Sequence, residues 1–158
     1  MTRMTRNLRP EVLEANLALV RSGLVELTWG NVSAVDRAAR RVVIKPSGMQ
    51  YADLSLSNLA EVELDSGLSS AGGLRPSSDT PTHLALYRAW PSIGAVAHTH
   101  STFATVFAQA ERSLPCLGTT HADHFDGAVP VTRRLCPDEI AGDYEDAVGR
   151  AIVEHFAG

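Results

Sequence analysis

The chain has 158 residues, of which 44% are apolar and 20% are charged, so it can bury a real core and we expect one ordered domain over residues 1–158. Fourteen basic against eighteen acidic residues give a formal net charge of −4, which excludes the broad positive surface that nucleic acid or anionic lipid would need. No apolar run approaches the roughly 20 residues that span a bilayer, and the first residues lack the apolar stretch of a signal peptide, so we expect a cytoplasmic protein without membrane partners.

The first predicted element is an amphipathic helix over residues 10–24. Pro10 suits the first turn of a helix, and Gly23 suits its end. The apolar residues that recur at helical spacing, and that we expect to face the core, are Leu13, Leu17, Val20 and Leu24.

Strands are predicted in the following part of the chain. Two β-rich runs, residues 24–36 and 41–48, flank the polar segment 37–40, which predicts a β-hairpin. Residues 60–67 offer a further short strand. The Gly and Ser residues between 66 and 79 predict a mobile surface loop.

A helix, a strand and a second helix are predicted after this loop. Residues 81–90 have the pattern of a helix that begins with proline, 93–100 of a buried strand, and 101–110 of a helix with a serine at its start. A short strand is expected around residues 128–132.

The last predicted element is a helix over residues 137–158. Its apolar stripe consists of Ile140, Tyr144, Val148, Ile152 and Phe156, four residues apart. The order of all these elements predicts a mixed α/β fold, in which helices cover a sheet whose hairpin part is antiparallel.

Two histidines end the predicted strand 93–100. Alternate side chains of a strand share a face and lie about 7 Å apart at their roots. His98 and His100 can therefore converge on one cation. By themselves they are also consistent with two histidines that form hydrogen bonds at a strand end, which is the simpler interpretation.

Polar residues precede the predicted helix 81–90. Ser77, Ser78 and the free amides of the first helical turn can hold a phosphate, because their donors point outward and the helix dipole favours an anion. Asp79 has two interpretations. It either caps the helix or directs its carboxylate at the metal site.

Two further clusters end the runs 24–36 and 41–48. Asn31 offers an amide, Lys45 a cation, Ser47 a hydroxyl and Gly48 a backbone N–H to a ligand. Each cluster, taken separately, is more simply explained as an ordinary turn.

The segment 118–127 is unusually polar for a short stretch. Its aspartates stand beside histidines and could exchange protons with a substrate hydroxyl, although an exposed loop is the simpler interpretation. His83 and His155 lie on predicted helices, and we expect both at the surface or the edge of the core.

Five segments, in this order, resemble the L-ribulose-5-phosphate 4-epimerase family of the class II aldolase/adducin superfamily. The segments are LTWGNVSAVD, VIKPSGMQY, PSSDTPTHLALY, HTHSTFATVFAQA and GTTHADHFDG. The resemblance extends from about Pro10 to the end of the chain. It implies a central, mainly antiparallel sheet flanked by helices, and a homotetramer with sites at subunit interfaces.

This resemblance also implies roles for residues of the polar clusters. A divalent metal, usually zinc, is expected on His98 and His100, with Asp79 beside it both at the metal and as a catalytic residue. Asp123 matches the catalytic acid/base of the family, and Thr119 lies where that loop meets the substrate. The residues that match substrate-binding and phosphate-binding positions are Asn31, Lys45, Ser47, Gly48, Ser77 and Ser78.

The implied reaction converts L-ribulose 5-phosphate, a small sugar phosphate, into D-xylulose 5-phosphate. The resemblance implies that the C3–C4 bond breaks by retro-aldol cleavage and forms again with C4 inverted, with the metal as electrophile and no redox cofactor. The aspartate at position 79 favours an epimerase over the alternative, a class II sugar-phosphate aldolase, where we expect a glutamate.

Members of this family continue beyond the position of Gly158. The resemblance therefore implies that the chain is incomplete at its C-terminus and lacks a third histidine ligand, further strands and a tyrosine that reaches the neighbouring subunit. A third hypothesis follows, a non-catalytic fold fragment or assembly module. His124 stands where the family has a tyrosine, which leaves its role open.

Overall fold

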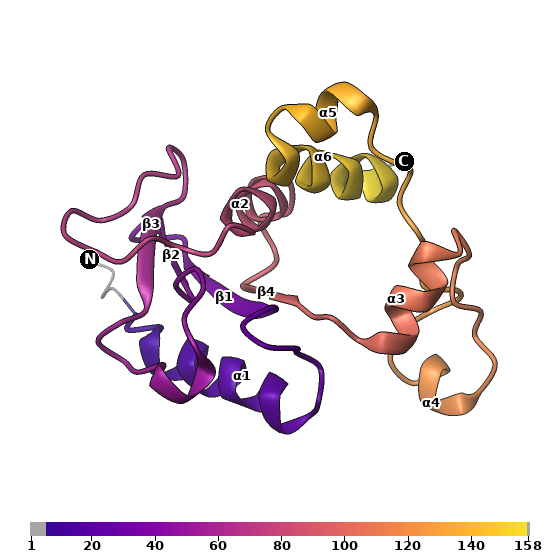
Figure 1. The fold of residues 1–158 in the computed structure, drawn as a ribbon, viewed down its shortest axis with the longest axis horizontal. Helices are drawn as coiled ribbons and strands as arrows, with labels where there is room; N and C mark the ends of the chain where they lie inside the picture. The colour runs from indigo at the N-terminus through magenta and orange to yellow at the C-terminus, as the bar shows by residue number, and fades with distance from the viewer. Residues whose placement is uncertain (1–5, 158) are drawn as a thin grey trace.

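In the computed structural model, which describes residues 6–157, helices flank an antiparallel sheet with the strand order β3-β2-β1-β4 (Figure 1). The strands are β1 (Asn31–Asp36), β2 (Arg41–Ile44), β3 (Ala60–Glu63) and β4 (Ala95–His98). The helices are α1 (Arg9–Arg21), the 3-10 turn η1 (Tyr51–Asp53), α2 (Thr80–Ala89), α3 (Thr102–Gln109), α4 (Thr119–Ala122), α5 (Pro137–Ala141) and α6 (Tyr144–Ala157). The expected mixed α/β fold is confirmed. The ends of the expected domain, residues 1–5 and 158, lie outside the described residues.

The predicted hairpin is confirmed, and it forms the centre of the sheet. Successive side chains of a strand point to opposite faces, so Ala34 and Val43 pack on the side of α1, whereas Val35 and Val42 pack on the side of α2. Both faces are thus covered by helices. Residues 24–30 were expected to extend the first strand, but they form a turn in which Leu27 has a φ of 53°.

Helix α1 is confirmed, but the predicted stripe does not mark its most buried face. Val12 and Leu19 are buried, whereas Val20 is 42% exposed. Compared with the prediction, the helix is rotated about its axis. The reason is that Asn16 also faces the core, where its side chain forms hydrogen bonds with the backbone of β1. A pattern of apolar residues does not reveal a buried polar one.

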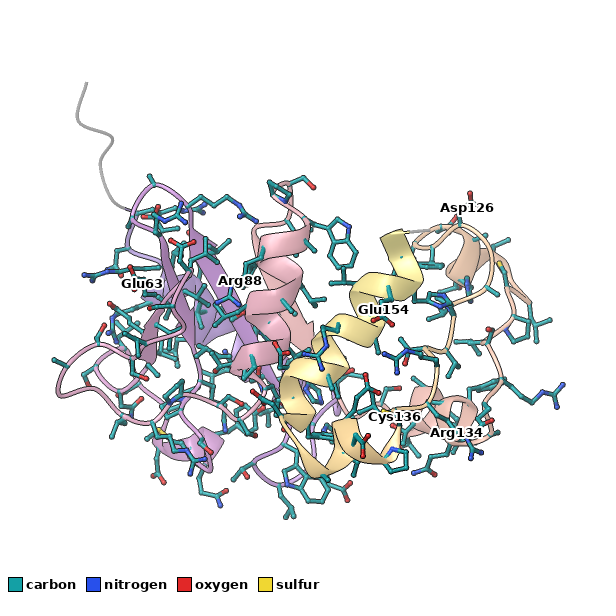
Figure 2. The ribbon with its side chains drawn as sticks, turned by 90° about the horizontal axis from the view of Figure 1, so that it is seen from above. Glu63, Arg88, Asp126, Arg134, Cys136 and Glu154 are labelled. Carbon is teal, nitrogen blue, oxygen red and sulfur yellow. The ribbon has the colours of Figure 1, made fainter. Side chains whose placement is uncertain are left out.

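Helices α2 and α6 pack closely on each other, as Figure 2 shows from above. A Cβ atom on Gly149 of α6 would lie 2.7 Å from Cβ of Ala85, so only glycine permits this approach. The predicted helix 137–158 is divided into α5 and α6, because Gly142 has a ψ of −132°, which is not helical. The predicted stripe was also misplaced, since Ala147 and Ala151 form the buried face.

Strand β4 is an edge strand, so the prediction of a buried strand was wrong. Among the strands of residues 6–157 it pairs with β1 alone, and its residues are exposed or half-buried. Beyond it, α3 and α4 have no buried residues and form a lobe away from the sheet, with Asp126 at the far end in Figure 2. The strand expected at 128–132 is reduced to one bridge between Leu114 and Val129.

Among the helices of residues 6–157, none has both the length and the apolar character needed to cross a membrane.

Candidate functional site

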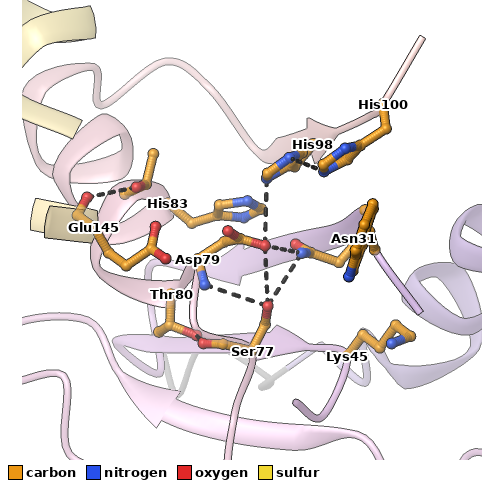
Figure 3. Close-up of polar contacts among 12 residues, drawn as sticks. Asn31, Lys45, Ser77, Asp79, Thr80, His83, His98, His100 and Glu145 are labelled. Carbon is orange, nitrogen blue, oxygen red and sulfur yellow. Dashed lines mark hydrogen bonds and ion pairs between the residues drawn. The ribbon is translucent and has the colours of Figure 1, made fainter. Parts of the chain in front are cut away.

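A cavity of about 750 Å³ opens where β1 begins, β4 ends and α2 begins. Asn31 and His98 lie opposite each other in the register of β1 and β4. Gly30 allows the chain to enter β1 here, because it has a φ of 83° and a Cβ would lie 2.7 Å from Val25 Cγ1 and 3.1 Å from the His98 carbonyl. Figure 3 shows the polar side chains that meet at this point.

Asp79 is the centre of these polar contacts. Its Oδ2 atom accepts hydrogen bonds from Asn31 Nδ2 at 2.6 Å and from Ser77 Oγ at 3.2 Å, and it lies 3.3 Å from His98 Nδ1. The carboxylate makes no capping bond to α2, so of the two interpretations the structure favours a carboxylate directed into the cavity.

The same contacts set the charge of this carboxylate. Burial favours a raised pKa for Asp79, but the hydrogen bonds from His98, Asn31 and Ser77 outweigh it and lower the pKa to about 2. The hydrogen bond to Asp79 in turn raises the pKa of His98, against the effect of burial. The site therefore holds an ionised carboxylate at neutral pH.

The two predicted histidines face each other. Their Nε2 atoms lie 3.0 Å apart and their rings are nearly parallel, with an interplanar angle of 6°. His98 thus presents Nδ1 to Asp79 and Nε2 to His100. The indole of Trp29 packs on the other ring, with its centroid 5.5 Å from that of His100.

This geometry can be compared with that of a metal site. Two nitrogen ligands at about 2.0–2.1 Å from a tetrahedral zinc lie about 3.3 Å from each other, which is close to the separation of the two Nε2 atoms. The His98–His100 pair therefore fits one cation. Asp79 contacts the opposite nitrogen of His98, and within residues 6–157 no three His, Cys, Asp or Glu side chains form a group able to hold a metal.

The residues expected to bind phosphate line the same cavity. Ser47, Gly48, Ser77 and Ser78 all belong to its wall. Lys45 is 2% exposed, donates to the Thr28 carbonyl at 3.0 Å and lies 4.8 Å from the Tyr51 ring centroid. Burial lowers the pKa of Lys45, and the charge of Asp79 opposes this effect.

Glu145 lines the cavity as well, although the sequence pattern did not single it out. It lies on α6, and its backbone carbonyl accepts a hydrogen bond from Thr82 Oγ1 at 2.6 Å. Burial and the charge of Asp79 raise the pKa of Glu145. No local signal could have found it, because α6 reaches the site through its packing on α2.

The structure does not bring Asp123 and Thr119 to this cavity. Both lie at α4, in the lobe beyond β4, and both are exposed. His124 forms a local hydrogen bond between its Nδ1 atom and the Thr120 carbonyl, at 2.9 Å. Their predicted roles at the substrate remain predictions.

The chain has relatives among known proteins. Residues 10–158 match the family described as "Class II Aldolase and Adducin N-terminal domain". The chain is 52% identical over 149 residues to the L-ribulose-5-phosphate 4-epimerase UlaF of Salmonella paratyphi C (strain RKS4594), and equally to that of Salmonella typhi. Each alignment covers 94% of this chain, and the chain spans 65% of the length of these curated relatives.

Solved structures resemble the fold. An L-fuculose 1-phosphate aldolase superposes with a TM-score of 0.75 and 26% identity, over 92% of this chain and 68% of the aldolase. The L-fuculose-1-phosphate aldolase of Thermus thermophilus gives a TM-score of 0.70 and 25% identity, over 92% of this chain and 70% of that protein. The family resemblance found in the sequence is confirmed.

Proposed function

Since this chain belongs to the class II aldolase and adducin N-terminal domain family, we propose that it is part of a metal-dependent L-ribulose-5-phosphate 4-epimerase. The observation that carries the proposal is the convergence of His98, His100 and Asp79 on one cavity. The identity of 52% to proteins of that name and the aspartate at position 79 support an epimerase.

The His98–His100 pair is the proposed site of a divalent metal, with zinc the expected ion. Such an ion, when bound, polarises a substrate carbonyl and stabilises negative charge that develops beside it. In this arrangement Asp79 orients the His98 ring. By accepting from Nδ1 of His98, it fixes the orientation and tautomer of that ring and increases the basicity of Nε2.

Proton transfer needs groups whose charge can change at the substrate. The raised pKa of Glu145 makes it a candidate for holding a proton near Asp79 and His98. By the family resemblance, Asp123 is the proposed acid/base. Lys45, with the hydroxyls at the cavity wall, would hold the phosphate.

We further propose a homo-oligomer in which sites are shared between subunits. Asp123 and Thr119 lie outside the cavity of their own chain, so they would act at the cavity of a neighbouring copy. Mixing Asp123→Asn with His98→Asn subunits tests this, because mixed oligomers would contain intact sites. Recovery of activity on mixing is expected, and two variants that stay inactive together would contradict shared sites.

The decisive experiment is conversion of L-ribulose 5-phosphate by the full-length protein with added zinc. Formation of D-xylulose 5-phosphate is expected, and no turnover would refute the proposal. Calorimetric titration with zinc tests the third hypothesis as well, since tight binding at one site per chain would contradict a non-catalytic module.

A class II sugar-phosphate aldolase is the second candidate, favoured by the similarity to L-fuculose 1-phosphate aldolases. The two reactions differ in their products. Accumulation of free glycolaldehyde phosphate or lactaldehyde from a ketose phosphate would support the aldolase, whereas epimerisation without released aldehyde would exclude it.

A further inference from the structure

Three buried polar side chains lie in a row behind the wall of the cavity. Ser33 Oγ on β1 lies 2.7 Å from His83 Nδ1 and 2.7 Å from the Tyr87 hydroxyl, both on α2. Ser33 and Tyr87 are 0% exposed and His83 is 1% exposed. His83 was expected at the surface or the edge of the core. It is fully buried, because α2 packs this face against the sheet.

Counting protons gives the direction of this chain of hydrogen bonds. A hydroxyl has one proton, so Ser33 donates either to Tyr87 or to His83. If His83 Nδ1 donated to Ser33 and Ser33 to Tyr87, the Tyr87 proton would have no acceptor among the described residues. The His83 Nε2 lone pair, which also has no partner there, would be a second unpaired group.

The opposite direction leaves one unpaired group in place of two. Tyr87 then donates to Ser33, Ser33 donates to His83 Nδ1, and Nε2 carries the proton. Each buried polar group without a partner costs about 1–3 kcal/mol, so this direction is favoured. Burial also lowers the pKa of His83 to about 4, which keeps the ring neutral at pH 7.

An acceptor without a partner among the described residues lines the same cavity. His83 and Asp79 both belong to the cavity wall (Figure 3), and the charge of Asp79 acts on the His83 ring. All the side-chain contacts of Asp79 recorded among the described residues involve Oδ2, so Oδ1 is available as an acceptor. A donor and an acceptor on one wall complement a hydroxyl group, which can both accept and donate.

We propose that His83 Nε2–H and Asp79 Oδ1 bind one hydroxyl group of the ligand, and that Ser33 and Tyr87 are positioning residues that hold His83 in the tautomer this requires. The identity of the ligand rests on the proposed function. The tautomer does not, because it follows from buried groups of this chain alone.

The test of the tautomer is an ¹⁵N NMR spectrum of the histidine rings of the full-length protein at pH 7. The protein without ligand should show His83 neutral with its proton on Nε2. Tyr87→Phe keeps the ring but removes the first donor of the chain, so a mixture of tautomers is expected there. A proton on Nδ1 in the unmodified protein would overturn the inference.

Kinetics with L-ribulose 5-phosphate and zinc tests the binding role. His83→Gln carries an amide nitrogen that can reach the position of Nε2, whereas the shorter His83→Asn reaches only that of Nδ1. We expect kcat/KM to fall about fivefold to tenfold more in His83→Asn, the loss of about one hydrogen bond. Equal values in the two variants would contradict the binding role.

The two proposals fail in different ways. An unmodified protein that does not turn over the substrate refutes the epimerase, while the NMR spectrum still decides the tautomer. An active protein whose His83 carries its proton on Nδ1 refutes this inference alone.

Discussion

Asn16 offers a quantitative test of how α1 holds β1 in place. Its Nδ2 donates to the carbonyls of Val12 at 2.7 Å and Val32 at 2.9 Å, and its Oδ1 accepts from Val32 N–H at 2.9 Å. In the register of β1 and β2, Val32 would face Lys45, but β2 ends at Ile44. The Asn16 amide therefore takes the place of the missing partner on β2. Val32 is the second residue of β1, next to Asn31, which lines the cavity.

Removing this amide leaves two buried backbone groups of Val32 unpaired. At about 1–3 kcal/mol for each unpaired group, we expect Asn16→Ala and Asn16→Leu to lower the free energy of unfolding by about 3 kcal/mol. Leucine fills the space of asparagine, so it separates the lost hydrogen bonds from a cavity effect. Urea denaturation followed by circular dichroism measures the change.

The matched control for this prediction lies on the same helix. Glu14 pairs with Arg21 at the surface, where its side chain is 68% exposed, so Glu14→Ala should change stability by about 0.5 kcal/mol or less. If Asn16→Leu were as stable as Glu14→Ala, the amide would not replace a strand partner and the reasoning would be refuted.

Three further predictions concern pH, metal and catalysis. The pKa of His83 is lowered from 6.5 to about 4, so only the unfolded chain gains this proton as pH falls from 6.5 to 4. Up to about 3 kcal/mol of stability is then lost. His83→Asn should flatten this part of the urea-stability profile, and an unchanged slope in that variant would show that His83 is not the group responsible. Asp79→Asn should weaken zinc binding about 10-fold to 100-fold in calorimetry, because Asp79 orients His98; unchanged affinity would argue against that role. Asp123→Asn should leave the unfolding midpoint unchanged, since Asp123 is exposed, but lower kcat by a factor of about 10²–10⁴. An unchanged kcat would show that Asp123 takes no part in proton transfer.

Local patterns in the sequence were sufficient for several parts of the fold and of the candidate site. Two β-rich runs around a polar segment predicted the β1–β2 hairpin, and Pro81 marked the start of α2. The two-residue spacing of His98 and His100 predicted two side chains that can converge, and their Nε2 atoms do meet, although β4 ends at His98 and His100 lies just beyond the strand. Each of these features depends on neighbouring residues in the chain.

Other features depend on residues far apart in the sequence. Asn16 faces the core because it forms hydrogen bonds with Val32, 16 residues away. His83 is buried because it forms a hydrogen bond with Ser33, 50 residues away. Glu145 reaches the cavity through the packing of α6 on α2. Apolar periodicity cannot report such contacts, because it shows that a helix has a face but not which element that face will meet. Neighbouring residues thus specify the hairpin, the start of α2 and the histidine spacing, whereas long-range packing selects the buried polar groups that share the cavity with them.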